Sequence, residues 1–344
     1  MNKAYESDAP ARAVPLGPTG YEVTRVGLGA WAIGGPWQKG WGAQDDRDSV
    51  ATIEHALASG VNWIDTAAVY GLGHAEAVIG EVLAGLEETD RPWVFTKCGR
   101  YEDPGIPGKA GRPDLIRRSC DESLRRLRVD RLDMLQLHWP PEDGTPLEVT
   151  WETMAELQRE GLVATLGACN CTARQLDVID AIARVDVVQP PLSMINRDSL
   201  STVIPWAAAK GAGVLVYSPM QSGILTGGFH ERAAMLEPDD WRLEDPEFQQ
   251  PNLDRNLQLV EGLRLVAARL ECTIAELVVA WALSRAGVTA AIVGARRPDQ
   301  VDGWRGADGV VIDLEAEAEI AVVIEASGAG HGPLAMPSDG ESDD

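Results

Sequence analysis

The stretch Val61-Asn62-Trp63-Ile64-Asp65-Thr66-Ala67-Ala68-Val69-Tyr70-Gly71 decides the fold of this 344-residue chain. Its first part, 61–64, is an apolar run of residue types that favour a β-strand. The run stops at the carboxylate of Asp65, and the phenol of Tyr70 follows in the next loop. This pattern predicts a buried strand that carries polar chemistry to one edge of a sheet.

Two later apolar runs end in the same way. Lys97 follows the run 93–96, and His138 follows the run 132–137. A single polar residue at a strand end is usually a turn cap or a solvated charge, but three such strand ends in succession favour a shared site. The carboxyl ends of the parallel strands of an α/β barrel lie on one face. We therefore expect four side chains around one opening: Asp65, Tyr70, Lys97 and His138.

The rest of the chain alternates strands and helices in a regular way. Strand-like runs lie at 26–29, 61–64, 93–96, 132–137, 163–168, 187–189, 214–217 and 291–293. Helical spacing is present at 49–58, 75–84, 113–127, 147–159, 172–183, 200–210, 253–270, 274–285, 298–305 and 315–326. Eight such units predict an α/β fold, a (β/α)8 TIM barrel with an N-terminal β-hairpin at 13–23 and extra C-terminal helices. An open, doubly wound sheet is the alternative architecture.

No change of composition divides the chain. The sequence therefore predicts a single barrel over 12–325, with a long loop at 219–250 and flexible termini at 1–11 and 330–344. The tail 338–344 carries four acidic residues and no basic one, which is typical of disorder.

One motif favours the alternative architecture. Gly27-Leu28-Gly29-Ala30-Trp31-Ala32 matches the loose dinucleotide fingerprint G-x-G-x-x-G/A. That fingerprint needs a helix to begin at the motif. Here Gly34-Gly35-Pro36 follows, and these residues oppose a helix. The motif is therefore interpreted as part of a barrel strand and its loop.

Composition limits the function classes. The net charge of −23 argues against nucleic acid and anionic membranes as partners. No apolar run reaches the length of a transmembrane helix, and the first residues lack the pattern of a signal peptide, so a cytoplasmic protein is expected. The few cysteines are expected to be reduced thiols rather than metal ligands: Cys98, Cys120, Cys169, Cys171 and Cys272.

The four strand-end residues together suit one kind of chemistry. A phenol holds its proton at neutral pH, and a nearby ammonium stabilises the phenolate, so Lys97 would make Tyr70 a better acid. Asp65 could keep a buried Lys97 charged, and His138 could donate a hydrogen bond to a carbonyl oxygen. The set suits protonation of a carbonyl oxygen as hydride reaches the carbon. It contains neither a Ser-His-Asp triad nor the opposed carboxylates of a glycosidase.

Three motifs, in order along the chain, resemble those of the aldo-keto reductase family. They are Gly60-Val61-Asn62-Trp63-Ile64-Asp65-Thr66-Ala67-Ala68-Val69-Tyr70-Gly71, Leu135-Gln136-Leu137-His138-Trp139-Pro140 and Ile292-Val293-Gly294-Ala295-Arg296-Arg297-Pro298-Asp299-Gln300. Two further stretches, Ala30-Trp31-Ala32-Ile33-Gly34-Gly35 and Glu237-Pro238-Asp239-Asp240-Trp241-Arg242, are most similar to the bacterial branch of inositol-operon and general-stress reductases.

The resemblance implies an NADP(H)-dependent oxidoreductase without a metal. Tyr70 would be the general acid/base, with its pKa tuned by Lys97. Asp65 would pair with Lys97, and His138 would position the carbonyl of an aldehyde or ketone. The hydride would come from the nicotinamide C4.

The same resemblance implies a set of residues that bind NADPH or NADP+. Asn170 and Gln189 would hold the carboxamide, and Tyr217 would stack on the nicotinamide. Other residues of the set lie in the first loop, along the backbone that would wrap the pyrophosphate, and at the adenosine end of the cofactor. With Asp65 they are Ala30, Trp31, Ser218, Pro219, Met220, Ser222, Gly223, Leu225, Gly294, Ala295, Arg296 and Gln300. Arg296 and Arg297 suit a 2′-phosphate, because guanidinium groups pair with phosphate oxygens, and this supports NADP over NAD.

Three positions depart from the family pattern. Cys169 replaces a Ser that is common before Asn170, and Ser222 replaces an Arg that is common before Gly223. Asp302-Gly303-Trp304 replaces a Glu-Asn pair, which puts one adenine contact in doubt.

The substrate pocket is expected from the first loop, the Trp139 region and the loop 219–250. Trp31, Tyr70, His138 and Trp139 are the predicted substrate contacts, with Trp37 and Trp41 as further aromatic candidates. Lys39, Arg47 and Arg242 could bind an anionic group, although solvated charges are the simpler interpretation. A small polar or sugar-derived aldehyde is the expected substrate.

Two alternatives stay open. The chain could be a cofactor-binding regulatory subunit with little turnover, since such subunits can keep all four residues. It could also be another barrel enzyme, such as an isomerase or a hydrolase. A monomer or weak homo-oligomer is expected, because no apolar face stands out in the sequence.

Overall fold

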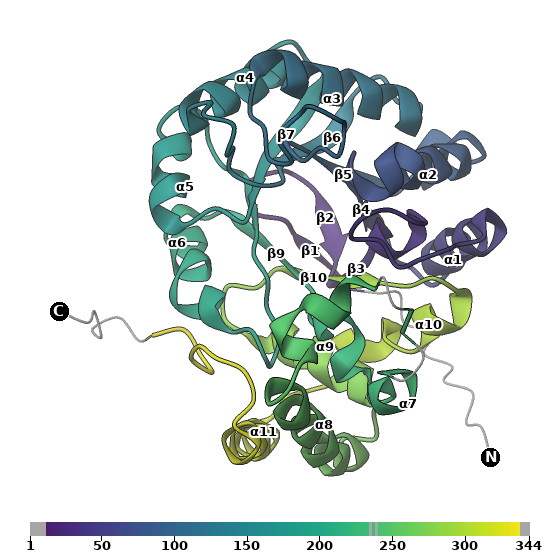
Figure 1. The fold of residues 1–344 in the computed structure, drawn as a ribbon, viewed down its shortest axis with the longest axis vertical. Helices are drawn as coiled ribbons and strands as arrows, with labels where there is room; N and C mark the ends of the chain where they lie inside the picture. The colour runs from purple at the N-terminus through teal and green to yellow at the C-terminus, as the bar shows by residue number, and fades with distance from the viewer. Residues whose placement is uncertain (1–11, 234–235, 238–239, 338–344) are drawn as a thin grey trace.

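The computed structural model describes residues 12–233, 236–237 and 240–337 and contains a closed barrel of parallel strands (Figure 1). The barrel strands are β3 (Val26–Gly29), β4 (Trp63–Asp65), β5 (Trp93–Cys98), β6 (Leu132–Leu137), β7 (Val163–Cys169), β8 (Val187–Gln189), β9 (Gly213–Tyr217) and β10 (Ala290–Gly294). They pair in the order β10-β3-β4-β5-β6-β7-β8-β9. The predicted (β/α)8 barrel is confirmed, and the open sheet is wrong because β10 pairs with β3.

Helices surround the strands, as Figure 1 shows. They are α1 (Asp46–Ala58), α2 (His74–Ala84), α3 (Pro113–Leu127), α4 (Leu147–Arg159), α5 (Ala173–Asp180), α6 (Val203–Lys210), α7 (Phe229–Ala233), α8 (Asn252–Arg269), α9 (Ile274–Ser284), α10 (Pro298–Asp302) and α11 (Leu314–Ser327). Threonine capping boxes begin α5 and α9, since Thr172 and Thr273 each exchange hydrogen bonds with the residue three positions later. No helix in the described part of the chain combines the length and apolarity needed to span a membrane.

Two predicted elements differ from the structure. The helix expected at 200–210 is divided into a 3-10 turn, η4 (Asp198–Ser201), and α6, because Thr202 has non-helical backbone angles of φ −126° and ψ −83°. The segment 219–250, expected to be one long loop, contains α7 and the short turns η5 (Gln221–Thr226), η6 (Trp241–Glu244) and η7 (Pro246–Phe248).

The predicted N-terminal hairpin consists of β1 (Ala13–Pro15) and β2 (Glu22–Thr24), paired antiparallel. Its buried side chains Leu16 and Val23 pack against Trp63 and other residues that point into the barrel. The hydroxyl of Tyr21 donates a 3.0 Å hydrogen bond to the carbonyl of Asp133 on β6. The hairpin therefore closes the end of the barrel opposite the carboxyl ends of the strands.

Packing inside the barrel explains the glycines of the G-x-G motif. A Cβ at Gly27 would lie 2.1 Å from the ring of Trp63, and one at Gly29 would lie 2.8 Å from Ile292. Only a four-residue 3-10 turn, η1 (Ala30–Ile33), follows the motif. The glycines thus make room for neighbouring barrel side chains, and the interpretation as a barrel strand and loop is confirmed.

The C-terminal region packs on the barrel beyond α11. Arg269 of α8 pairs with Glu319 of α11 at 2.7 Å, and the two helices lie side by side. Arg197 donates hydrogen bonds from its backbone to His331 at 3.1 Å and from its side chain to Gly332 at 3.0 Å. His331 and Gly332 are therefore hydrogen-bonded to the barrel, and the flexible terminus expected at 330–344 stays a prediction. The expectations for 1–11 and 338–344 lie outside the described residues.

Candidate active site

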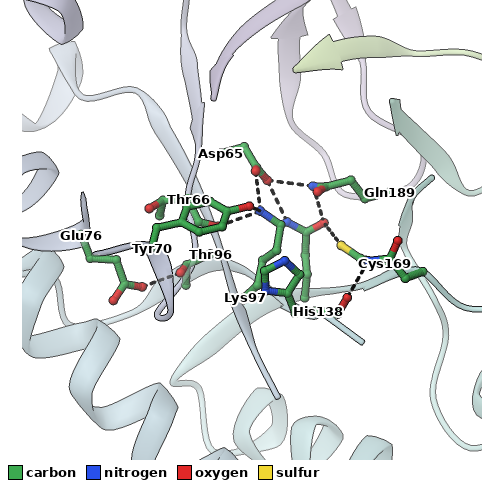
Figure 2. A network of polar contacts seen from close by, with 11 residues as sticks. Asp65, Thr66, Tyr70, Glu76, Thr96, Lys97, His138, Cys169 and Gln189 are labelled. Carbon is green, nitrogen blue, oxygen red and sulfur yellow. Dashed lines mark hydrogen bonds and ion pairs between the residues drawn. The ribbon is translucent and has the colours of Figure 1, made fainter. Parts of the chain in front are cut away.

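The four strand-end side chains meet at the carboxyl ends of β4, β5 and β6 (Figure 2). The ammonium of Lys97 forms an ion pair with Oδ1 of Asp65 and donates to the carbonyl of Thr66 at 2.8 Å. The same ammonium lies 3.3 Å from the hydroxyl of Tyr70. The rings of Tyr70 and His138 have centroids 5.8 Å apart in an edge-to-face arrangement. The fold thus brings together all four residues expected from the sequence.

The second oxygen of Asp65 is held by two glutamines. Oδ2 accepts hydrogen bonds from Gln189 at 2.7 Å and from Gln136 at 3.2 Å. Gln189 also donates to the side-chain oxygen Oε1 of Gln136 at 3.0 Å, and Sγ of Cys169 lies 3.7 Å from that oxygen. Because both carboxylate oxygens have donors, the orientation of Asp65 toward Lys97 is fixed (Figure 2).

Burial increases the effect of this ion pair on the pKa of Lys97. Asp65 and Lys97 are only 2% and 1% exposed. Burial alone would lower the pKa of Lys97, but the charge of Asp65 and the contact with Tyr70 raise it above its ordinary value. Lys97 is therefore a cation at every physiological pH.

The pKa of Tyr70 is set mainly by burial. Burial raises it from 10.0 to about 12, although the charge of Lys97 acts in the opposite direction. Lys97 lowers the pKa of Tyr70, as expected. The net shift is nevertheless upward, because desolvation of the phenolate outweighs one nearby cation. Tyr70 holds its proton in the resting site.

His138 is neutral at pH 7. Burial, together with the charges of Lys97 and Arg100, lowers its pKa well below 6.5. Its Nδ1 is buried and has no hydrogen-bond partner among the described residues. A neutral imidazole can donate a hydrogen bond from one nitrogen without adding charge to the site.

A second buried network supports the loop that carries Tyr70. Glu76, fully buried in α2, accepts a hydrogen bond from Thr96, the neighbour of Lys97 on β5. Its other oxygen accepts from Arg126 of α3 at 2.7 Å. The helix that follows Tyr70 is thereby fixed to the strand that carries Lys97 (Figure 2).

These residues open into a cavity of about 740 Å³. Of the residues predicted for the site, the following line it: Trp31, Asp65, Tyr70, His138, Trp139, Asn170, Gln189, Tyr217, Ser218, Pro219, Met220, Ser222, Gly223, Gly294, Ala295, Arg296 and Gln300. Ala30 and Leu225 are fully buried in the hydrophobic core and are not part of this lining. Lys97 lies behind Tyr70, in contact with its hydroxyl.

Aromatic side chains form one wall of the cavity. The ring of Trp31 lies 5.4 Å from the rings of Trp41 and Trp241, and its indole nitrogen donates to the carbonyl of Lys39 at 2.9 Å. Trp37 lies 6.1 Å from the ring of Tyr70. The first loop and the segment 219–250 therefore meet at the cavity, as expected from their places after β3 and β9.

The amides predicted to hold a carboxamide already contact protein groups. Asn170 donates to the carbonyl of His138 at 2.9 Å and accepts from the hydroxyl of Tyr217 at 2.8 Å. Asn170 retains a second proton and a second lone pair for a ligand, whereas Gln189 already donates to Asp65 and to Gln136 and can only accept, through its amide oxygen. The three side chains thus form a fixed edge of the cavity.

The turn after β9 has a backbone suited to anions. Ser218, Gln221 and Ser222 have positive φ angles of 56°, 44° and 50°, and Gly223 has 100°. Left-handed residues beside right-handed ones turn successive N–H groups to one side and make anion-binding concavities. Residues other than glycine rarely adopt a positive φ angle without a structural or functional reason.

Three guanidinium groups also line the cavity: Arg242, Arg296 and Arg297. Burial, with the charges of Arg297 and Arg242, lowers the pKa of Arg296. Gln44 accepts a 2.7 Å hydrogen bond from Arg296, and Gln300 accepts one from its backbone at 2.7 Å. Arg242 pairs with Asp240 at 2.6 Å and Arg297 with Asp299 at 3.1 Å, so an anion bound here would chiefly offset the charge of Arg296.

The positions that depart from the family pattern have other partners. Cys169 contacts Gln136, as described above, and Trp304 is 2% exposed in the core. Asp302 pairs with His55 and with Arg305, both at 3.0 Å. The residues at 302–304 that depart from the family pattern therefore make their own contacts within this protein.

Comparison with known proteins decides the family. The family model described as the aldo/keto reductase family matches residues 25–321. The chain belongs to the aldo/keto reductase family. The aldo-keto reductase YhdN of Bacillus subtilis (strain 168) is 33% identical over 312 residues, which cover 90% of this chain and 92% of that protein.

Two further relatives are similar over most of their length. The NADH-specific methylglyoxal reductase of Escherichia coli (strain K12) is 32% identical over 303 residues, covering 84% of this chain and 91% of that protein. The structure of the glycerol dehydrogenase AKR11B4 from Gluconobacter oxydans matches with a TM-score of 0.83 and 33% identity, and the match covers 95% of this chain and 99% of that one. The predicted family resemblance is confirmed. Membership of the aldo/keto reductase family supports carbonyl reduction as the general activity.

Sequence reasoning missed two polar residues of this aldo/keto reductase site. Gln136 is hidden inside the apolar run 132–137, where a lone amide among buried positions was the available signal. Arg100 lines the cavity three positions after Lys97, and a single arginine after a strand is indistinguishable in sequence from a solvated charge.

Proposed function

We propose that this aldo/keto reductase is an NADP(H)-dependent enzyme that reduces an aldehyde or ketone to an alcohol, with Tyr70 as the general acid. One observation carries the proposal. The hydroxyl of Tyr70 lies 3.3 Å from a buried ammonium that an equally buried carboxylate holds in place, and both Tyr70 and His138 line one cavity.

Tyr70 supplies the proton. Its pKa of about 12 keeps the phenol protonated in the resting site, so the acid form is present throughout the neutral range. As the proton passes from Oη to the substrate oxygen, negative charge develops on the phenolate. Lys97 stabilises that charge at short range in a site with little water, where such interactions are strongest.

His138 positions the carbonyl. A neutral imidazole beside Tyr70 can donate a hydrogen bond to the same oxygen that accepts the proton of Tyr70. Asp65 contacts neither the substrate nor the transferred proton in this scheme. It keeps Lys97 charged and in place, with Gln136 and Gln189 holding the carboxylate.

Bound nicotinamide would supply the hydride that attacks the carbonyl carbon. Tyr217, Asn170 and Gln189 would bind the nicotinamide end, and the left-handed turn Ser218–Gly223 would bind the pyrophosphate. The cavity volume of about 740 Å³ and the unbroken lining from Tyr70 to Arg296 support this arrangement.

The choice of NADP over NAD rests on the guanidinium groups at 296 and 297. Arg297 is exposed and pairs with Asp299 at 3.1 Å, so it is free to move to a phosphate. Arg296 is crowded by like charges, and a 2′-phosphate would offset that repulsion. One relative is described as NADH-specific, so both cofactors belong in every assay.

The substrate class that we propose is a small polar or sugar-derived aldehyde. Trp37 beside Tyr70 and Trp139 beside His138 offer ring faces on which a short polar chain can pack. The cytoplasmic location and the monomeric or weakly associated state stay predictions from the sequence.

The test follows NADPH and NADH consumption at 340 nm with a panel of aldehydes and sugar aldehydes, for wild type beside Tyr70→Phe. We expect turnover in the wild type and a loss of about 10²- to 10⁴-fold in kcat in the variant. Cofactor binding, measured by fluorescence titration, should be unchanged. Tight cofactor binding without turnover on any carbonyl would instead support the regulatory-subunit alternative. Turnover of another reaction without nicotinamide would support a different barrel enzyme.

A further inference from the structure

The half-buried side chain of Arg100 is a cation at the substrate end of the cavity. It lines the cavity together with Tyr70, His138 and Trp139. Its charge acts on His138, where it contributes to the lowered pKa of the imidazole. Arg100 is therefore close to the place where a carbonyl would bind.

Arg100 has no counter-charge within the part of the chain that the structure describes. Among the described residues, no carboxylate pairs with its guanidinium and no oxygen accepts a hydrogen bond from it, unlike Arg242, which pairs with Asp240 at 2.6 Å. Asp65 is the one carboxylate in the described lining of the cavity, and Lys97 already holds it. No acidic group of the cavity lining is left for Arg100.

The loop that carries Arg100 is fixed rather than loose. The backbones of Arg100 and Lys109 form an antiparallel bridge, and the neighbouring amide of Tyr101 donates to Gly108 at 3.0 Å. Tyr101 packs in a small buried cluster with Ala110 and Leu115. A fixed backbone removes the need to order the loop when a ligand binds, so only the side chain of Arg100 loses freedom, which favours recognition of a charged partner.

We propose that Arg100 binds an acidic group of the substrate, so that this site prefers carbonyl compounds that carry a carboxylate or a phosphate. The inference rests on the proposed reductase function and refines its substrate class. The carbonyl oxygen would lie at Tyr70 and His138, and the acidic group would accept hydrogen bonds from the guanidinium of Arg100. Guanidinium groups suit both acids, because their paired N–H donors match two oxygens at once.

The net charge of −23 determines the range over which Arg100 can act on an anionic substrate. A strongly acidic protein repels anions at long range, and salt screens that repulsion beyond about 8 Å under physiological conditions. An uncompensated arginine inside the cavity acts below this distance. It therefore selects an anion that has entered the cavity, rather than attracting one from solution.

The experiment compares pairs of carbonyl compounds in which one member carries an acidic group and the other does not. Steady-state reduction is measured for succinic semialdehyde against butanal, and for glyceraldehyde 3-phosphate against glyceraldehyde. The proteins are wild type, Arg100→Met, Arg100→Lys and Arg91→Met. Arg91 is an exposed arginine that precedes the opposite end of β5, so Arg91→Met removes the same charge far from the cavity.

We expect the wild type to prefer the charged member of at least one pair. Arg100→Met should lower kcat/KM for that member by about 10- to 100-fold and change the neutral member by less than about 2-fold. Arg100→Lys should restore part of the loss, and Arg91→Met should match wild type. Preference for the carboxylate or for the phosphate identifies which acid the site takes.

Two results would overturn the inference. One is a wild type that reduces the neutral members as well as the charged ones. The other is an equal loss for both members in Arg100→Met, which would indicate a general structural role. Tryptophan fluorescence of the cofactor-saturated protein, titrated with butyrate and with inorganic phosphate, gives a second readout. If no carbonyl is reduced, the reductase proposal fails, and anion binding that is weakened in Arg100→Met still decides the role of Arg100.

Discussion

Asp65→Asn tests whether a buried carboxylate keeps Lys97 charged. The change keeps the size of the side chain and removes one charge from a pair that is 2% and 1% exposed. It also turns an acceptor into a donor that faces Lys97 or the amides of Gln136 and Gln189. Breaking a buried ion pair by removing one partner destabilises a protein by about 3–5 kcal/mol.

The size of the effect can be worked out independently. Without Asp65, burial would drive Lys97 to release its proton, which at pH 7 costs at most about 4.6 kcal/mol relative to an unfolded pKa of about 10.4. An unfolding entropy of about 2.1 cal/mol/K per residue gives roughly 0.7 kcal/mol/K for 344 residues. The variant should therefore melt about 4–7 °C below wild type.

The pH dependence gives the sharper signature. In the wild type the pKa of Lys97 is raised, so its contribution to stability is complete below the unfolded pKa and is lost only above it. In Asp65→Asn the pKa of Lys97 is lowered, so the deficit is largest at low pH. It should shrink by up to about 1.4 kcal/mol per pH unit between pH 7 and pH 9.

The assay is thermal unfolding of both proteins at pH 7, 8 and 9, followed by circular dichroism. Asp46→Asn is the matched control, because Asp46 pairs with His74 at 2.7 Å on the surface and should change stability by less than about 1 kcal/mol. An Asp65→Asn protein that melts within about 1 °C of wild type, or with a pH-independent deficit, would refute the reasoning.

Three further predictions concern the acid, the barrel interior and the cofactor. Because the pKa of Tyr70 is about 12, reductive kcat should show no loss from ionisation of Tyr70 between about pH 6 and pH 10; a pH–rate profile in which Tyr70 titrates near neutrality contradicts this. Gly27→Ala should destabilise the protein by about 1–3 kcal/mol, since its Cβ would lie 2.1 Å from the ring of Trp63, whereas Gly309→Ala, with open space around it, should not; urea unfolding compares the two. Arg296→Gln should raise KM for NADPH by about 10-fold or more and leave KM for NADH nearly unchanged, and equal effects on both cofactors would exclude a 2′-phosphate contact.

The fold was predictable because barrel strands are buried on both faces. Such strands are short apolar runs, and the helices between them keep a separate period, so the alternation is visible in the sequence. The break in the predicted helix 200–210 had a local signal, because Pro205 has no N–H to donate and is tolerated only in the first turn of a helix. The contact of Arg197 with Gly332, 135 residues later, depends on tertiary context and is not visible in a local pattern.

The site was predictable where a charged residue ends an apolar strand, as at Asp65 and Lys97. Two kinds of information were missing from the sequence. The sum of burial and charge at Tyr70 requires the depth of the side chain, which reverses the direction expected from Lys97 alone. The importance of Arg100 depends on which acidic groups lie near it, and only the assembled cavity answers that.

Closure of the barrel also constrains how the chain is made. Val26 on β3 pairs with Ala291 on β10, 265 residues later, so the two ends of the sheet meet only when most of the chain has left the ribosome. At about 5–20 residues per second, the edge of β3 waits roughly 13–53 s for its partner. An unpaired strand edge is a template for aggregation. Yield of this protein should therefore depend on chaperones that hold the growing chain more than on the stability of the finished barrel.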